Sequence, residues 1–85
     1  MSFELIFDKK AASELSKLPK DIQKRIFTKL QQSKENPQRF FERLSGRLDY
    51  KMRIGKYRVI ADLNPDKNQI QITKIGHRKN IYEKE

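Results

Sequence analysis

The most constraining feature of this chain is a run of alternating apolar and polar side chains on both sides of the Gly-Lys pair at positions 55–56. Alternation with a period of two places successive side chains on opposite faces of a strand. Because a two-residue loop that begins with glycine suits a II′ turn, residues 50–60 are predicted to form a β-hairpin. The short loop fixes the register, so we expect Arg53 directly opposite Arg58, with Lys51 on the same face. Like charges placed opposite one another destabilise a hairpin, so we expect a polyanion to bind this face.

The N-terminal half has the patterns of one strand and two helices. Residues 3–7 form a short apolar run typical of a strand, and Asp8 is suited to cap a helix over residues 9 to about 17. The Leu18-Pro19 pair ends that helix, because the residue before a proline disfavours the helical conformation. Pro19 can begin a second helix over residues 19 to about 34. Two apolar stripes at helical spacing are predicted to cover a sheet: Ala11, Ala12, Leu15 and Leu18 in the first helix, and Ile22, Ile26, Phe27 and Leu30 in the second.

The C-terminal half has the period of strands. Residues 38–46 are predicted to be a connection whose apolar side chains pack on the rest of the protein. Ile75 departs from the alternation that Ile70 and Ile72 begin, which indicates a bulge before Gly76. The three predicted strands cover residues 47–54, 57–63 and 69–75.

This order of elements predicts an α+β fold of two layers, β-α-α-β-β-β. The N-terminal strand and a helical hairpin are expected to pack on one face of a small, mainly antiparallel twisted sheet. The pattern does not say where residues 3–7 join that sheet. The other sheet face is left open for a ligand.

Length and composition limit the possible classes of protein. The 85 residues fit one domain spanning 1–85. The chain has no cysteine, and its one histidine, His77, cannot hold zinc alone, so we expect no metal and no cofactor. No apolar run reaches the roughly 20 residues of a membrane span, and the N-terminus lacks the pattern of a signal peptide, so we expect no membrane partner and a cytoplasmic location. The formal net charge of +9 favours a polyanionic partner.

Three segments resemble the RelE/ParE toxin family. They are Leu44-Ser45-Gly46, the hairpin over residues 50–60, and Ile75-Gly76-His77-Arg78 followed by Tyr82. The resemblance covers nearly the whole chain, including the Leu18-Pro19 break, and it is strongest to the RelE branch. It implies a toxin of a type II toxin–antitoxin system that acts as a ribosome-dependent mRNA endonuclease, an mRNA interferase. The implied partners are the ribosome, mRNA and a cognate, RelB-like antitoxin.

RNA carries its own nucleophile, the 2′-hydroxyl, so its cleavage needs no metal. The protein must help to remove a proton, stabilise the charged transition state and assist the leaving oxygen. The resemblance implies that Lys51 is a base or stabiliser, that Arg58 stabilises the phosphate, and that Arg78 protonates or stabilises the leaving group. It also implies that Tyr82 orients or activates the 2′-hydroxyl. Further RNA or phosphate contacts are expected from Arg53, Lys56 and His77, and ribosome contacts from Lys20, Lys24, Arg25 and Lys29.

Two other functions remain open at this point. A ParE-like inhibitor of DNA gyrase needs no catalytic set, and an inactive homologue could bind RNA without cleaving it. The individual residues also have structural alternatives. Lys51 and Arg53 could be solvated surface, Arg58 could pair with Asp62, and Tyr82 could pack on the sheet edge.

Overall fold

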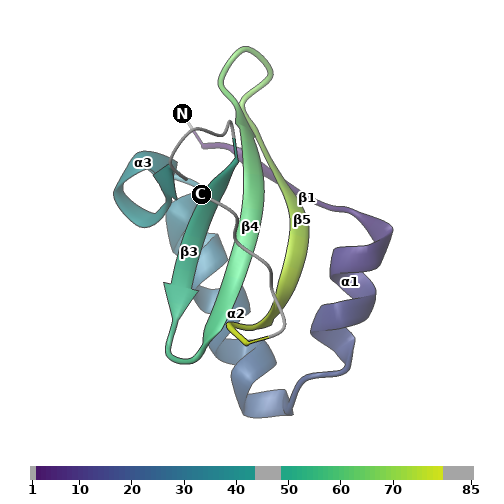
Figure 1. The fold of residues 1–85 in the computed structure, drawn as a ribbon. Helices are drawn as coiled ribbons and strands as arrows, with labels where there is room; N and C mark the ends of the chain where they lie inside the picture. Colours follow the sequence, from purple (N-terminus) through teal and green to yellow (C-terminus); the bar gives the residue numbers. More distant parts are fainter. Residues whose placement is uncertain (1, 44–48, 80–85) are drawn as a thin grey trace.

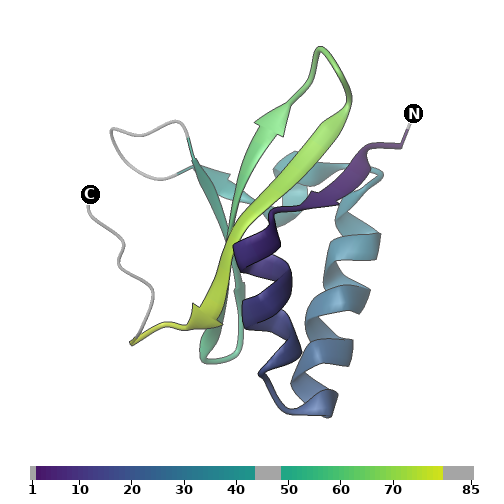
Figure 2. The ribbon, with the colours of Figure 1, turned by 90° about the vertical axis from the view of Figure 1, so that its right-hand side faces the viewer.

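The computed structural model describes residues 2–43 and 49–79. This part of the chain forms two layers, a five-stranded sheet and a helical layer on one of its faces, which confirms the predicted α+β class (Figures 1 and 2). The strands lie in the order β1-β5-β4-β3-β2. The helices are α1 (Lys9–Ser16), α2 (Lys20–Ser33) and α3 (Pro37–Phe40). The strands are β1 (Glu4–Phe7), β2 (Glu42–Arg43), β3 (Tyr50–Ile54), β4 (Tyr57–Asn64) and β5 (Gln69–His77).

The prediction that residues 38–46 are only a connection is wrong, because the described part of this segment contains most of the helix α3 and the strand β2. Pro37 occupies the start of α3. Its missing N–H costs nothing there, because the first N–H groups of a helix have no acceptor within the helix. β2 then pairs with β3 through Glu42 opposite Lys51. Phe41 is buried, so the expectation that this region packs is confirmed. Residues 44–48, which include Leu44-Ser45-Gly46, lie outside the described residues, and so does Tyr82.

The N-terminal strand β1 joins the sheet at the edge of β5 and runs parallel to it. Leu5 lies opposite Ile70, and Phe7 lies opposite Ile72. Parallel neighbours require a long crossover connection. Here the crossover starts with α1 and α2, which pack side by side on one face of the sheet (Figure 2).

The hairpin of β3 and β4 has the predicted register. Arg53 lies opposite Arg58, and Ile54 lies opposite Tyr57. Gly55 has a φ of 59° while Lys56 is not at positive φ, which fits the predicted II′ turn and excludes I′. A Cβ placed on Gly55 would lie 3.8 Å from the Nη2 atom of Arg25. The guanidinium of α2 therefore packs over this turn.

The bulge predicted before Gly76 exists, and it lies at Thr73. Ile60 of β4 lies opposite Lys74, whereas the next residue of β4, Ala61, lies opposite Ile72, which leaves Thr73 as the extra residue. The hydroxyl of Thr73 donates a hydrogen bond to the carbonyl oxygen of Ile60 at 3.2 Å. The bulge reverses the alternation, so Ile75 faces the core together with Ile72.

The core lies between the sheet and the helices, and two of the predicted stripe residues are not part of it. Ala12 is exposed, and Phe27 is 47% exposed. Phe27 follows Ile26 by one residue and so lies about 100° around the helix from it, at the flank of the buried stripe. Ser33 is fully buried on that stripe instead, and its hydroxyl donates to the carbonyl oxygen of Leu30 at 2.7 Å.

Asp8 is the N-cap of α1, as predicted, but its side chain makes no capping bond. Its Oδ1 atom accepts a hydrogen bond from Nε2 of Gln71 at 2.6 Å, and its backbone N–H donates to the carbonyl oxygen of Ile72 at 2.9 Å. Asp8 thus fixes the point where the chain leaves β1 and enters α1.

The two residues Leu30 and Phe27 provide a test of the core. We expect Leu30→Ala to lower the free energy of unfolding by about 2–5 kcal/mol, because it removes a fully buried side chain. Phe27→Ala should cost clearly less, although it removes more atoms. Denaturant unfolding followed by circular dichroism measures both changes. An equal loss in the two variants would contradict this description of the α2 packing face.

Candidate functional site

The sheet face turned away from the helices carries a group of cations near the β3–β4 turn. We call this surface the cation face. It consists of Lys51, Arg53, Lys56, Arg58 and Arg78. No helix of the described residues covers it (Figure 2).

Three strands contribute to the centre of the cation face. Arg53 of β3 lies opposite Arg58 of β4, and Arg58 lies opposite Gly76 of β5. Gly76 contributes no side chain beside Arg58. The backbone N–H of Arg78 donates to the carbonyl oxygen of Lys56 at 2.9 Å, so the pairing continues beyond β5. Alternation carried one residue past the end of β5 at His77 predicts Arg78 on the face of Arg58.

The cations differ in exposure. Arg53, Lys56 and Arg78 are exposed, whereas Lys51 and Arg58 are half-buried. The Nε atom of Arg58 is buried. A half-buried guanidinium at the centre with exposed cations around it forms a surface that can hold an anion through several charge-assisted hydrogen bonds.

Acidic side chains occupy the opposite end of the same sheet face. Partial burial of the carboxyl, followed by the charges of Asp49 and Asp8, raises the pKa of Asp62 above its ordinary value. Asp49 therefore lies close enough to Asp62 to act on its carboxyl group. Between the two ends, Ile60 of β4 is only 3% exposed and lies outside the main core cluster. This face is therefore divided into an acidic end and a basic end.

His77 does not lie on the cation face. It lies opposite Tyr57 on the helix side of the sheet, and the two rings meet edge to face with their centroids 5.5 Å apart. Its Nδ1 atom accepts a hydrogen bond from the backbone N–H of Lys79 at 3.1 Å. The geometry separates His77 from Arg53 and Lys56, with which the sequence analysis grouped it as a contact to RNA or phosphate.

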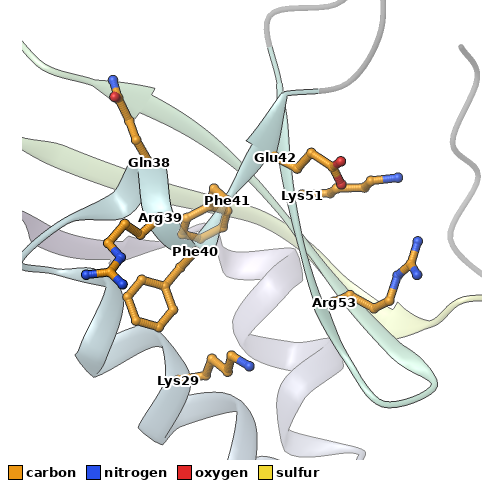
Figure 3. Close-up of a pocket in the computed structure, with 8 residues that line it drawn as sticks. All are labelled: Lys29, Gln38, Arg39, Phe40, Phe41, Glu42, Lys51 and Arg53. Atoms are coloured by element: carbon orange, nitrogen blue, oxygen red, sulfur yellow. The ribbon is translucent and has the colours of Figure 1, made fainter.

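A groove of about 940 Å³ runs along the outer edge of β3, between this strand, α2 and α3 (Figure 3). Lys51 and Arg53 of β3 and Lys29 of α2 are among the residues that line it. A second groove of about 590 Å³ shares Lys29 and Arg53 with the first and is also lined by Lys24 and Arg25. The basic residues predicted on α2 are all exposed, and three of them, Lys24, Arg25 and Lys29, line these grooves, whereas Lys20 does not.

Sequence reasoning missed the contribution of α3 to the first groove. Arg39 and Phe40 line it, as Figure 3 shows, and Glu42 of β2 lies at its rim beside Lys51. The one signal that could have revealed α3 is Asn36-Pro37, because proline is favoured in the first turn of a helix. The segment is only four residues long, too short for an apolar period to appear.

Across residues 2–43 and 49–79, no three His, Cys, Asp or Glu side chains come close enough together to hold a metal ion. In the same ranges, none of the helices has the length and apolarity that crossing a membrane requires. The chemistry that the site itself offers is electrostatic. Guanidinium and ammonium groups on a rigid sheet can bind a phosphodiester and stabilise additional negative charge on it.

The fold and the cation face define a class of small basic proteins with a helical hairpin on one sheet face and cations on the other. The family described as the ParE toxin of type II toxin–antitoxin system, parDE, matches residues 5–82. The chain belongs to this family, as the resemblance of its segments to RelE/ParE toxins predicts. No curated protein is significantly similar to the chain.

Solved structures of RelE toxins have the same fold. The chain is similar to the RelBE2 toxin–antitoxin complex of Mycobacterium tuberculosis, with 21% identity, a TM-score of 0.82 and coverage of 92% of this chain and 100% of that one. It is also similar to a mutant of the Escherichia coli toxin RelE in the free state, with 26% identity, a TM-score of 0.78 and coverage of 91% and 84%. For the RelE–RelB complex of Pyrococcus horikoshii, the identity is 26%, the TM-score 0.76 and the coverage 95% and 100%. The chain is thus a type II toxin with a RelE-like fold.

The acidic end of the sheet gives a pH-dependent prediction. Because the folded state raises the pKa of Asp62, folding favours its protonated form, and the cost of the charged form is present in full at neutral pH. Asp62→Asn should therefore raise the melting temperature at pH 7. The gain should shrink as the pH falls and vanish below the ordinary aspartate pKa of about 3.9.

Melting curves between pH 3 and pH 7 measure this difference. Asp66→Asn, in the exposed turn between β4 and β5, makes the same charge change as a matched control. A gain for Asp62→Asn that is equal at both ends of the pH range would show that the carboxylate charge is not its source.

Proposed function

We propose that the chain is an mRNA interferase, a toxin that cleaves mRNA in the ribosome through the 2′-hydroxyl of the substrate. The observation that supports the proposal is the register that puts Arg53 beside Arg58 on the sheet face that no helix of the described residues covers, with Arg78 directly after the end of β5. An inhibitor that acts only by binding has no need of clustered guanidinium groups around a glycine. Cleavage of a phosphodiester does, because the transition state gains negative charge at the phosphate.

The proposed roles follow from charge and exposure. Arg58, half-buried at the centre, holds the scissile phosphate, and Arg53 and Lys56 bind neighbouring phosphates. Lys51 assists removal of the 2′-hydroxyl proton or stabilises its charge. Arg78 stabilises the leaving oxygen electrostatically, since a guanidinium stays protonated in proteins and is a poor proton donor. Tyr82 remains a proposal from the family resemblance alone, and His77 supports the sheet from its other face.

The ribosome is the proposed setting of the reaction. The cation face offers no conventional acid–base pair among the described residues, so the bound mRNA must be oriented by something besides this small protein. The basic residues of α2, Lys20, Lys24, Arg25 and Lys29, are proposed to contact ribosomal RNA phosphates. Contacts of this kind weaken steeply as the salt concentration rises.

A cognate antitoxin is the other proposed partner. The M. tuberculosis and P. horikoshii relatives are toxin–antitoxin complexes, RelBE2 and RelE–RelB. The net charge of +9 favours an acidic partner segment. We propose a RelB-like antitoxin that covers part of this basic surface and keeps the toxin inactive.

The second candidate function is inhibition of DNA gyrase, which the ParE name of the matching family favours. The two functions have separable readouts. A gyrase supercoiling assay with the purified chain should show no inhibition, while primer extension on a reporter mRNA should show new 5′ ends. Inhibited supercoiling with intact mRNA would select the gyrase function.

Substitutions on the cation face test the proposed chemistry. With purified ribosomes and a defined mRNA, Arg58→Ala and Arg78→Ala should each reduce the cleavage rate at least roughly 100-fold, the scale of removing a transition-state contact. The physical reason is the loss of one guanidinium that faces the reacting phosphate.

Lys67→Ala, in the turn at the other end of β4 and β5, removes one positive charge from an exposed position and serves as the matched control. It should cleave within about twofold of the unchanged protein, since a single distant surface charge alters little. Thermal melting shows that the variants are folded. Cleavage at the unchanged rate by either arginine variant overturns the assignment of the cation face.

A further inference from the structure

β5, the strand that directly precedes Arg78, extends further than the edge strand β1 that pairs with it. β1 pairs with β5 from Gln69 to Ile72, whereas β5 continues to His77. The chain leaves the sheet at Asp8, whose N–H makes the last bond to the carbonyl oxygen of Ile72. From there on, no described strand lies on that side of β5.

The N–H of Ile75 points toward this open side. In an antiparallel ladder, hydrogen-bonded pairs alternate with pairs that exchange no bonds. The bond from the N–H of Arg78 to the carbonyl oxygen of Lys56 marks those two residues as a bonded pair. Counting back along the register, Ile75 and Val59 form a pair of the other kind, so the backbone groups of Ile75 face away from β4.

The side chain of Glu14 on α1 meets this N–H. Ile75 donates to Oε1 of Glu14 at 3.1 Å, in a half-buried position. α1 packs against β5, directly after β1 has ended, as Figure 2 shows. The carboxylate of Glu14 thus accepts a hydrogen bond that a longer β1 would otherwise accept. It satisfies the N–H of Ile75, which burial would leave without a partner.

The hydrogen bond between Ile75 and Glu14 holds the end of β5, which lies next to the cation face. Ile75 directly precedes Gly76, which lies opposite Arg58, and Arg78 follows two residues later. The bulge at Thr73 interrupts the regular ladder just before this segment. The end of β5 is therefore held by Glu14 on one edge and by the carbonyl oxygen of Lys56 on the other.

We propose that Glu14 is a positioning residue for RNA cleavage. It lies on the helix side, away from the cation face, and acts by fixing the last residues of β5 so that Arg78 faces the substrate phosphate. The inference rests on the proposed ribonuclease function for its kinetic part. Its structural part, the control of the Ile75 amide by Glu14, stands independently.

The kinetic test uses the full chain with ribosomes and mRNA. Glu14→Ala should lower kcat roughly 10- to 100-fold, the scale of a small misplacement of a catalytic group, and leave KM nearly unchanged. Glu14→Gln keeps an oxygen acceptor of the same reach and should restore most of the rate. Glu35→Ala removes an exposed carboxylate two residues beyond the end of α2 and should have no effect.

A double variant separates positioning from general destabilisation. If Glu14 acts through Arg78, adding Glu14→Ala to Arg78→Ala should change the rate by no more than about twofold. Losses that multiply in the double variant overturn the proposal, as does an unchanged rate in Glu14→Ala alone. All variants are assayed well below their measured melting temperatures.

Amide exchange tests the structural part without any cleavage. Glu14→Ala should speed hydrogen exchange at the Ile75 amide and shift the NMR signals of Gly76 and Arg78, while Glu35→Ala should leave them in place. Unchanged exchange at Ile75 overturns the role of Glu14. If these shifts occur but the unchanged protein cleaves no mRNA, the proposed function fails and the positioning of the β5 end stands.

Discussion

The register of the β3–β4 hairpin, which places Arg53 opposite Arg58, constrains the arrangement of the rest of this structure. Two charges a few ångströms apart at the surface repel by about 1 kcal/mol in water. On the other face of the same hairpin, Met52 and Val59 are buried opposite each other, and each contributes about 1.5–3 kcal/mol. Burial of Met52 and Val59 therefore determines the register, and the same register places Arg53 opposite Arg58 despite their repulsion. The turn at Gly55, with its positive φ, allows no slip that would separate them.

The bulge at Thr73 has an equally direct consequence. Ile70 and Ile72 face the core, and a regular strand would continue that alternation to Lys74, Gly76 and Arg78. The extra residue reverses it, so Ile75 is buried and Arg78 returns to the cation face. The single extra residue, Thr73, thus allows both the burial of Ile75 and the outward position expected for Arg78. The reversal also turns His77 toward Tyr57, on the helix side.

The hairpin could be predicted from the sequence because a two-residue turn and strict alternation are local signals. The bulge was visible as an apolar residue out of phase, but its position was not, since Thr73, Lys74 and Gly76 give no apolar contrast. Phe27 was assigned to the core because it adjoins a true stripe residue, and only the placement of the sheet decides which flank is covered. The edge position of β1 depends on pairing between residues far apart in the chain. Short elements such as α3 have too few residues to show a period.

The division of charge along the sheet explains why a binding function fits this fold better than stability alone. Arg53 faces Arg58 at one end, and at the other end partial burial, followed by the charge of Asp49, raises the pKa of Asp62. Exchanging one residue of each pair would turn two repulsions into two attractions without touching the core, since all four side chains belong to the outer face. Folding stability alone does not favour this separation of positive and negative side chains along the sheet. A phosphate chain lying across the basic end reverses the sign of that interaction, and the repulsion then becomes part of the binding energy.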